Sequence, residues 1–193
     1  FTLPTGICFL SISVWWSARI GLLMRTCCCF LEVFMDSDVR VFGAEEVLEL
    51  TRRTRALLPD VVMSVTVPHI LPMDQQEQLA VELVAAGADL IQTEGGTSAK
   101  PFSAGSLGLI EKAAPTLAAA HSISAALQQA GLRAPVLCAS GLSAVTVSMA
   151  IAAGASGVGV GSAVNRLSDE LAMVAVVRSL REALTASPAT SRV

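Results

Sequence analysis

The chain has 193 residues, 53% of them hydrophobic, and a formal net charge of −3. This length can bury one core and is too short for two, so we expect a single folded domain. The basic residues are scattered along the sequence, which excludes the clustered positive surface that nucleic-acid binding requires.

Residues 1–31 are apolar, contain Arg19 and Arg25, and carry no acidic residue before Glu32. A membrane helix needs about 20 largely apolar residues. The run 7–18, which Arg19 ends, has only 12 residues, so a membrane partner is not expected. This basic, acid-poor segment is interpreted as a targeting peptide or as a gene-model artefact, with a genuine part of the fold or a membrane anchor as the remaining alternative.

The cysteine pattern argues against a metal site. Cys27, Cys28 and Cys29 are adjacent, without the two-residue gap of the usual zinc-binding pair, and no histidine lies near them. We therefore predict reduced thiols in an apolar segment and no metal.

From residue 44 onward, helical and strand patterns alternate. Apolar residues recur at helical spacing in 44–58, whereas the short β-branched run 61–67 lies between two prolines and predicts a strand. The same patterns predict further helices over 74–88, about 105–130, 143–153 and 168–184, and further strands over 89–94, 135–139 and 157–161. The folded domain is expected over 32–186, with a disordered tail over 187–193.

Two segments of the sequence repeat the same order of elements. "AAGADLIQTEGG" (85–96) and "AAGASGVGVGSA" (152–163) both show a helix end, a capping glycine, a strand and a glycine-bearing loop. The repeat supports a regular strand–helix architecture.

Helix starts are expected near Asp74, Ser143 and Ser168, which are good N-cap residues.

Strands that alternate with helices predict a parallel sheet covered by helices. Glycine-bearing loops after the last two strands favour a barrel over a dinucleotide fold, whose glycines follow the first strand. A full barrel needs about 200 to 250 residues, and only four strand–helix pairs are evident, with 30–35 as the remnant of a fifth strand. We expect an α/β fold, the C-terminal half to two-thirds of a (βα)8 TIM-type barrel with N-terminal strands missing or replaced. Open sheet edges would need a cover, which is compatible with a homo-oligomer.

Two glycine-bearing turns form the predicted phosphate site. Ser140 and Gly141 follow one apolar run, and Gly161 and Ser162 follow the next. Glycine lets a backbone approach a ligand, and unpaired N–H groups at such turns bind anions. The alternative is that the glycines permit tight turns and the serines cap helices.

Long stretches of the chain resemble a known family. "FGAEEVLELTRRTRALLPDVVMSVTVPHILPMDQQEQLAVELVAAGADLIQTEGGTSAKP", "GLIEKAAPTLAAAHSIS", "PVLCASGLS" and "GVGVGSAVNRL" occur in order over about residues 42–184. They resemble the uncharacterised cyanobacterial and plastid family named after hypothetical chloroplast reading frame 23. The resemblance implies a phosphate-binding barrel related to thiazole synthase and flavin-linked barrels. It also implies a plastid location in a photosynthetic eukaryote, and a cytoplasmic one otherwise.

Catalytic candidates lie where the predicted strands end, as in other barrels. Glu94 could exchange a proton, or brace its own loop through the amides that follow it. His69, in a stiff loop between two prolines, could act as an acid or base, or brace that loop. Lys100 lies beyond Glu94, where phosphate or solvent is its expected partner. The loop between Glu94 and Lys100 adds the ligand-binding candidates Gly95, Gly96, Thr97 and Ser98.

Three hypotheses for function follow. The first is a barrel that binds a phosphorylated small molecule, with FMN as the first candidate. The second is a non-flavin enzyme that acts on a phosphosugar, as a lyase or synthase. The third is a metabolite-sensing or scaffold protein that binds such a molecule without turnover.

Overall fold

The described part of the protein is built on one parallel sheet. A computed structural model describes residues 26–29, 42–95 and 101–186. Within them, five strands pair in sequence order, each parallel to the next. The strands are β1 (Thr26–Cys29), β2 (Val62–Thr66), β3 (Leu90–Gln92), β4 (Val136–Ala139) and β5 (Gly157–Gly159).

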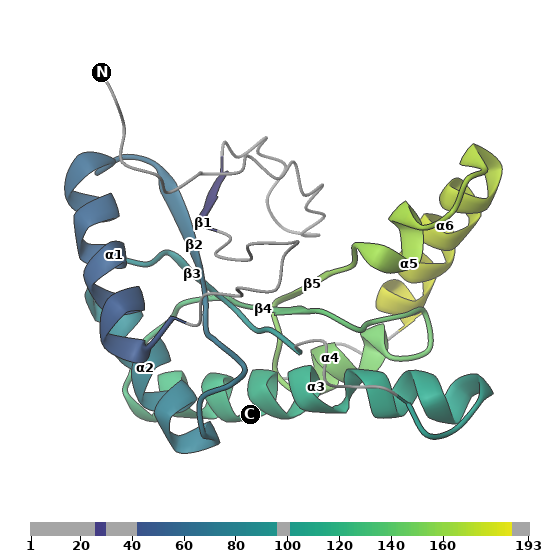
Figure 1. The fold of residues 1–193 in the computed structure, drawn as a ribbon, viewed down its shortest axis with the longest axis horizontal. Helices are drawn as coiled ribbons and strands as arrows, with labels where there is room; N and C mark the ends of the chain where they lie inside the picture. Colours follow the sequence, from purple (N-terminus) through teal and green to yellow (C-terminus); the bar gives the residue numbers. More distant parts are fainter. Residues whose placement is uncertain (1–25, 30–41, 96–100, 187–193) are drawn as a thin grey trace.

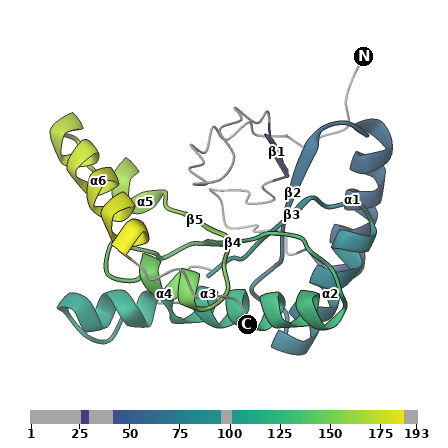
Figure 2. The ribbon, with the colours of Figure 1, turned by 180° about the vertical axis from the view of Figure 1, so that it is seen from behind.

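Helices connect the strands and lie along one side of the sheet. They are α1 (Ala44–Leu57), α2 (Met73–Ala85), α3 (Gly105–Gln129), α4 (Val147–Ala152), α5 (Ser162–Asn165) and α6 (Glu170–Ala186). Figure 1 shows them as a curved row from α1 to α6, and Figure 2 shows the same row from behind. This curvature is what a partial barrel requires, because the sheet bends towards the side opposite its helices.

The alternation of strands and helices predicted from the sequence is confirmed. The four predicted strands from 61 to 161 overlap β2, β3, β4 and β5. The strand expected at 30–35 lies outside the described residues, and the structure instead shows β1 at Thr26–Cys29. The sheet therefore starts upstream of the expected domain boundary at residue 32.

Two of the predicted helix starts are wrong. Residues 143–146 form a turn before α4, which starts at Val147, and within this turn the Thr146 hydroxyl accepts the Ser143 N–H at 3.0 Å. Asp169 rather than Ser168 precedes α6, and its Oδ1 accepts the Leu171 N–H at 3.0 Å. Side-chain hydrogen bonds of this kind brace the turn at which a helix begins, and in both cases the regular helix starts after the predicted residue.

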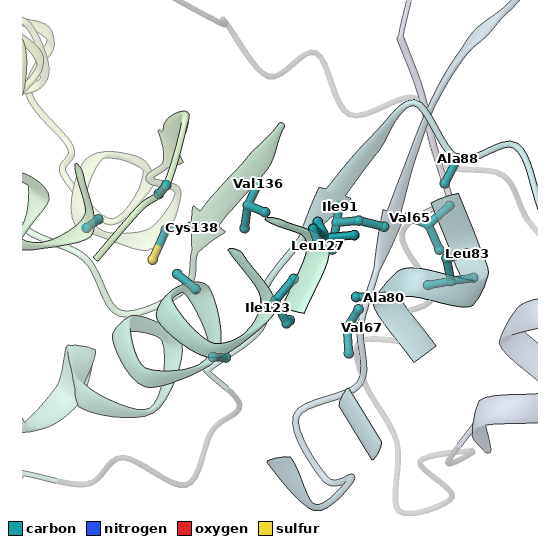
Figure 3. Close-up of a cluster of buried hydrophobic side chains, with 14 of the residues drawn as sticks. Val65, Val67, Ala80, Leu83, Ala88, Ile91, Ile123, Leu127, Val136 and Cys138 are labelled. Atoms are coloured by element: carbon teal, nitrogen blue, oxygen red, sulfur yellow. The ribbon is translucent and has the colours of Figure 1, made fainter. Parts of the chain in front are cut away.

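The core lies between the sheet and its helices. Alternate residues of the strands, such as Val65, Ile91 and Val136, point towards α2 and α3, whose Leu83 and Ile123 fill the space between (Figure 3). Residues that alternate with them occupy the opposite, inward face of the sheet. Ser64, Leu90, Gln92 and Leu137 lie there and are buried as well.

The predicted repeat is visible in the hydrogen bonds at two helix ends. Gly87 after α2 has φ 104° and Gly154 after α4 has φ 103°. The Ala88 N–H donates to Leu83 O, and the Ala155 N–H donates to Ala150 O. A left-handed residue with this backbone bond is a Schellman motif, and glycine supplies it without a Cβ clash. The first motif leads directly into the buried strand β3, and the second into the half-buried strand β5.

Arg55 joins α1 to the amino-terminal edge of the sheet. Its guanidinium donates from all three nitrogens, and its side chain is 21% exposed. Its acceptors are the carbonyl oxygens of Leu58, Pro59, Val61 and Gly87 and the carboxylate of Asp89. Arg55 therefore satisfies carbonyl groups that no helix or strand of the described chain pairs.

One face of α6 remains apolar and exposed. Leu171, Val174 and Val177 recur at helical spacing and are 79%, 46% and 51% exposed. β5 is an edge of the described sheet, since it pairs only with β4 there. The open sheet edge expected from the sequence is thus present at β5. No helix among the described residues has the length and hydropathy needed to cross a membrane.

We predict that Arg55→Met lowers the free energy of unfolding by about 1 to 3 kcal/mol, because partly buried carbonyl groups lose a charged donor. Urea denaturation measures this change. Arg53→Met is the matched control, since Arg53 forms only an exposed pair with Glu49 on the same helix and should change stability by less than about 0.5 kcal/mol. Equal effects of the two substitutions would contradict the assignment.

Candidate functional site

The candidate residues collect at the carboxyl-terminal edge of the sheet. His69 follows β2, Glu94 follows β3, Gly141 follows β4 and Gly161 follows β5. Since the four strands are parallel neighbours, these residues share one edge. This is the edge at which barrel proteins place their functional groups.

His69 and Glu94 contact each other. The distance from His69 Nδ1 to Glu94 Oε2 is 2.9 Å, and the side chains are 30% and 19% exposed. The His69 backbone N–H also points to Glu94 Oε2, at 3.4 Å. The carboxylate therefore holds both the ring and the backbone of the loop after β2.

This contact sets the tautomer of the imidazole. An ionised carboxylate only accepts hydrogen bonds, so the proton of a neutral His69 ring must lie on Nδ1. Nε2 then keeps its lone pair, and no described residue donates to it. A histidine oriented by a carboxylate in this way can accept a proton from a ligand.

A pocket of about 270 Å³ lies beside the pair. Gln76 of α2 lines this pocket. It is 6% exposed, and its side chain donates to Leu71 O at 2.7 Å. The remaining lining residues are His69, Leu71, Met73, Glu94, Gly95, Pro115 and Ala118. The pocket combines a potential base with apolar walls, but it does not include either glycine-bearing turn.

Gly95 links the pocket to the first turn. A Cβ placed on Gly95 would lie 3.3 Å from the Ser140 hydroxyl oxygen, a tight contact. Gly95 also lines the pocket. Its lack of a side chain lets the loop after β3 lie against the turn after β4.

The first turn has two consecutive residues in the left-handed region. Ser140 has φ 78° and Gly141 has φ 73°. A Cβ on Gly141 would lie 2.7 Å from the carbonyl oxygen of Lys112, so glycine is required by the packing of α3 on this turn. The N–H groups of Gly141 and Leu142 donate to no described residue, although Leu142 is only 4% exposed. Buried backbone donors are nearly always paired, so an acceptor is expected here.

The second turn is open. Gly161 has φ −112°, which other residues adopt, and a Cβ there would meet nothing within 4 Å. Ser162 starts the short helix α5 and is exposed. Neither backbone strain nor packing within the described chain requires glycine at 161.

A buried polar network lies beneath the first turn. The Thr93 and Thr116 hydroxyl oxygens are 2.6 Å apart, and the Thr116 hydroxyl also bonds Ala139 O. The Ala139 N–H donates to the Thr93 hydroxyl at 3.2 Å. The network therefore ties α3 to the ends of β3 and β4, directly before Ser140.

Cys138 is part of the same network. Burial raises the pKa of its thiol, and hydrogen bonds with Thr116 and Thr93 lower it by less. A thiol with a raised pKa stays protonated and is a poor nucleophile. Cys138 is therefore a core residue.

Glu111 of α3 fixes the loop that precedes this helix. Its carboxylate accepts the Ser103 hydroxyl at 2.7 Å and the Phe102 N–H at 2.8 Å. Hydrogen bonds from the Ser103 side chain and then its backbone hold the pKa of Glu111 below its ordinary value. A lowered pKa stabilises the folded loop near neutral pH, and this contribution is lost as the pH falls through it.

Several of the sequence candidates cannot be placed. Gly96, Thr97, Ser98 and Lys100 lie outside the described residues. Of the remaining candidates, His69, Glu94, Gly95 and Ser140 form a connected set, whereas Gly161 and Ser162 lie one strand further along the same edge. No group of described residues has the composition and spacing of a metal site.

Gln76, Thr116 and Lys112 were not predicted as site residues. Gln76 binds the loop just before its own helix, whereas Thr116 and Lys112 contact residues that are distant in sequence. Gln76 and Thr116 could have been noticed in the sequence, because each is a polar residue on the face of its helix that is turned towards the protein core. Lys112 carries no comparable signal.

We predict that Glu94→Leu abolishes the preference of neutral His69 for the Nδ1–H tautomer. A hydrogen bond to a charged acceptor is worth about 1.5 to 3 kcal/mol, which corresponds to a bias of at least about tenfold. Nitrogen-15 chemical shifts of the ring report the tautomer. Glu94→Gln is the control, because its amide oxygen can still accept the proton. Finding the Nε2–H tautomer in the unaltered protein would contradict this geometry.

Comparison with known structures supports the barrel fold. A solved structure described as 3-hexulose-6-phosphate synthase aligns with a TM-score of 0.50 at 20% identity, covering 74% of this chain and 57% of that one. With the parallel strand–helix order, this confirms the predicted fold class, a partial TIM-type barrel.

Sequence relatives identify the family. The chain is 36% identical over 159 residues to "Uncharacterized protein ycf23" of Porphyra purpurea, covering 82% of the chain and 56% of the relative. It is 38% identical over 135 residues to the protein of the same name in Cyanophora paradoxa, covering 70% and 53%. The chain spans about half the length of the curated relatives it matches.

These relatives carry the name of a plastid reading frame, which supports the plastid location expected for a photosynthetic eukaryote. Residues 31–190 also match the family described as "Protein of unknown function (DUF561)". The chain therefore belongs to the DUF561 family, to which its sequence resemblance to chloroplast reading frame 23 had pointed.

Proposed function

We propose that the protein binds a phosphorylated small molecule at the carboxyl-terminal edge of its sheet. The turn Ser140–Gly141 and the turn Gly161–Ser162 contact the phosphate. The His69–Glu94 pair faces the part of the ligand that reacts.

The observation that carries this proposal is the set of unpaired donors at the first turn. The N–H groups of Gly141 and Leu142 have no acceptor among the described residues, and Leu142 is buried. Successive N–H groups at a left-handed turn form a concave site for an anion. A phosphate oxygen would satisfy donors that the described chain leaves unpaired.

Gly161 supplies independent support. The fold does not require glycine there, since a Cβ would enter open space. A close approach of a ligand to the backbone explains the glycine, because a Cβ would occupy that space. The β4–β5 register pairs Ala139 with Gly159, so Gly141 and Gly161 follow at equivalent positions of the same edge.

The spacing of the strands sets the shape of the ligand. Neighbouring strands are about 4.8 Å apart, so the loop after β3 lies roughly 10 Å from the loop after β5. A ligand that reaches both Gly161 and Glu94 must therefore carry its phosphate at one end and its reacting group at the other. FMN and sugar phosphates both have this form.

We place FMN first and a phosphosugar second. FMN would bring its own redox chemistry, and the chain's residues would bind the phosphate and orient the ring. A phosphosugar is supported by the shared fold, since the solved synthase is named for a hexulose phosphate. In that case His69 Nε2 would take a proton from the sugar, while Glu94 holds the imidazole.

We predict that the purified protein retains a phosphorylated compound that mass spectrometry detects after denaturation. We also expect it to bind inorganic phosphate in a calorimetric titration. Gly161→Val should weaken phosphate binding about tenfold or more, a loss of roughly 1.4 kcal/mol, because the added side chain enters the anion site.

Gly43→Val is the matched control, since a Cβ at Gly43 also meets nothing within 4 Å. Yellow protein that releases FMN would select the flavin, and a colourless protein that releases a sugar phosphate would select the second ligand. If folded protein neither retains a phosphorylated compound nor binds phosphate, the proposal is wrong. Binding without turnover of the released compound would favour a sensor or scaffold.

A further inference from the structure

Lys112 lies against the first glycine-bearing turn. It is a half-buried residue in the second turn of α3. A Cβ on Gly141 would lie 3.3 Å from Lys112 Cγ, and 2.7 Å from its carbonyl oxygen. The stem of the lysine side chain therefore starts at the turn whose N–H groups are unpaired.

The ammonium group of Lys112 has no acceptor in the described part of the chain. No ion pair or side-chain hydrogen bond among the described residues involves Lys112. The neighbouring carboxylate of Glu111 is already bonded to Ser103 and Phe102, on the loop before the helix. The stem of a lysine whose ammonium has no acceptor among the described residues thus lies beside the turn, next to a carboxylate that faces another loop.

This arrangement suits a phosphate monoester. Backbone N–H groups supply directional hydrogen bonds to a phosphate but only partial charge. A lysine ammonium adds a full positive charge on a flexible stem, as in other phosphate sites. From Cγ beside Gly141, the remaining bonds of the side chain can carry Nζ over the turn.

We propose that Lys112 is the cationic ligand of the phosphate bound at the Ser140–Gly141 turn, an inference that rests on the phosphate site proposed above. Gly141 then has two roles. It makes room for the Lys112 backbone, and it brings the lysine stem close enough for Nζ to reach an anion on the turn.

The test is calorimetric titration of the 193-residue chain with inorganic phosphate. Lys112→Met keeps the apolar stem and removes the charge, so we expect phosphate affinity to fall about tenfold or more, the loss typical of a charged hydrogen bond. Lys112→Arg should restore most of the affinity. Arg133→Met is the matched control, because Arg133 precedes β4 at the opposite edge of the sheet.

The salt dependence of binding is a second measurement that a packing role would not change. Loss of Lys112 should flatten the decrease of affinity with ionic strength, whereas loss of Arg133 should not. The melting temperature of Lys112→Met should stay close to that of the unaltered protein. This result would separate a charge effect from a folding defect.

The outcomes distinguish this inference from the phosphate site itself. If the unaltered protein binds phosphate and Gly161→Val weakens it, but Lys112→Met has the affinity and salt dependence of the unaltered protein, the site stands and the role of Lys112 is wrong. If Lys112→Met weakens binding and Gly161→Val does not, Lys112 is supported and the second turn is excluded. Absence of phosphate binding by the unaltered protein overturns both.

Discussion

The parallel direction of the sheet is the constraint on which the rest of the structure depends. Because every described strand runs the same way, loops that are far apart in sequence meet at one edge. His69, Glu94, Gly141 and Gly161 are brought together in this way.

The two edges of the sheet differ in their hydrogen bonding. At the amino-terminal edge Arg55 satisfies backbone carbonyl groups, whereas at the carboxyl-terminal edge the Gly141 and Leu142 N–H groups have no acceptor among the described residues. The contacts that stabilise the fold and the residues proposed to bind a ligand therefore lie at opposite ends of the strands.

The two glycine-bearing turns look alike in sequence but differ in physical origin. Gly141 is fixed by the fold, because its φ is left-handed and α3 leaves no space for a Cβ. Gly161 has neither restriction. Gly141 is therefore explained by the fold alone, and its role in the proposed phosphate site is additional. Gly161 is not explained by packing among the described residues, and the proposed ligand accounts for it.

Much of the fold could be predicted from the sequence, because β2 to β5 are short apolar runs between clear turn signals. The common edge of His69 and Glu94 followed from the parallel order. Their direct contact did not, since it depends on the side-chain geometry of two loops. The start of α4 was predicted too early, because residues 143–146 form a turn that the apolar spacing does not distinguish from a first helical turn. The approach of Lys112 to Gly141 could not be predicted either, because it depends on how closely α3 packs against the sheet.

The most direct test of an anion site at the first turn is to locate a tetrahedral oxyanion in crystals of the protein. Tungstate resembles phosphate in shape, and its metal gives a strong anomalous signal. We predict an anomalous peak within hydrogen-bond distance of the Gly141 and Leu142 nitrogens, reduced when excess phosphate is added. A peak confined to the exposed arginines of α6, or density for a chain segment on those two nitrogens, would contradict the site.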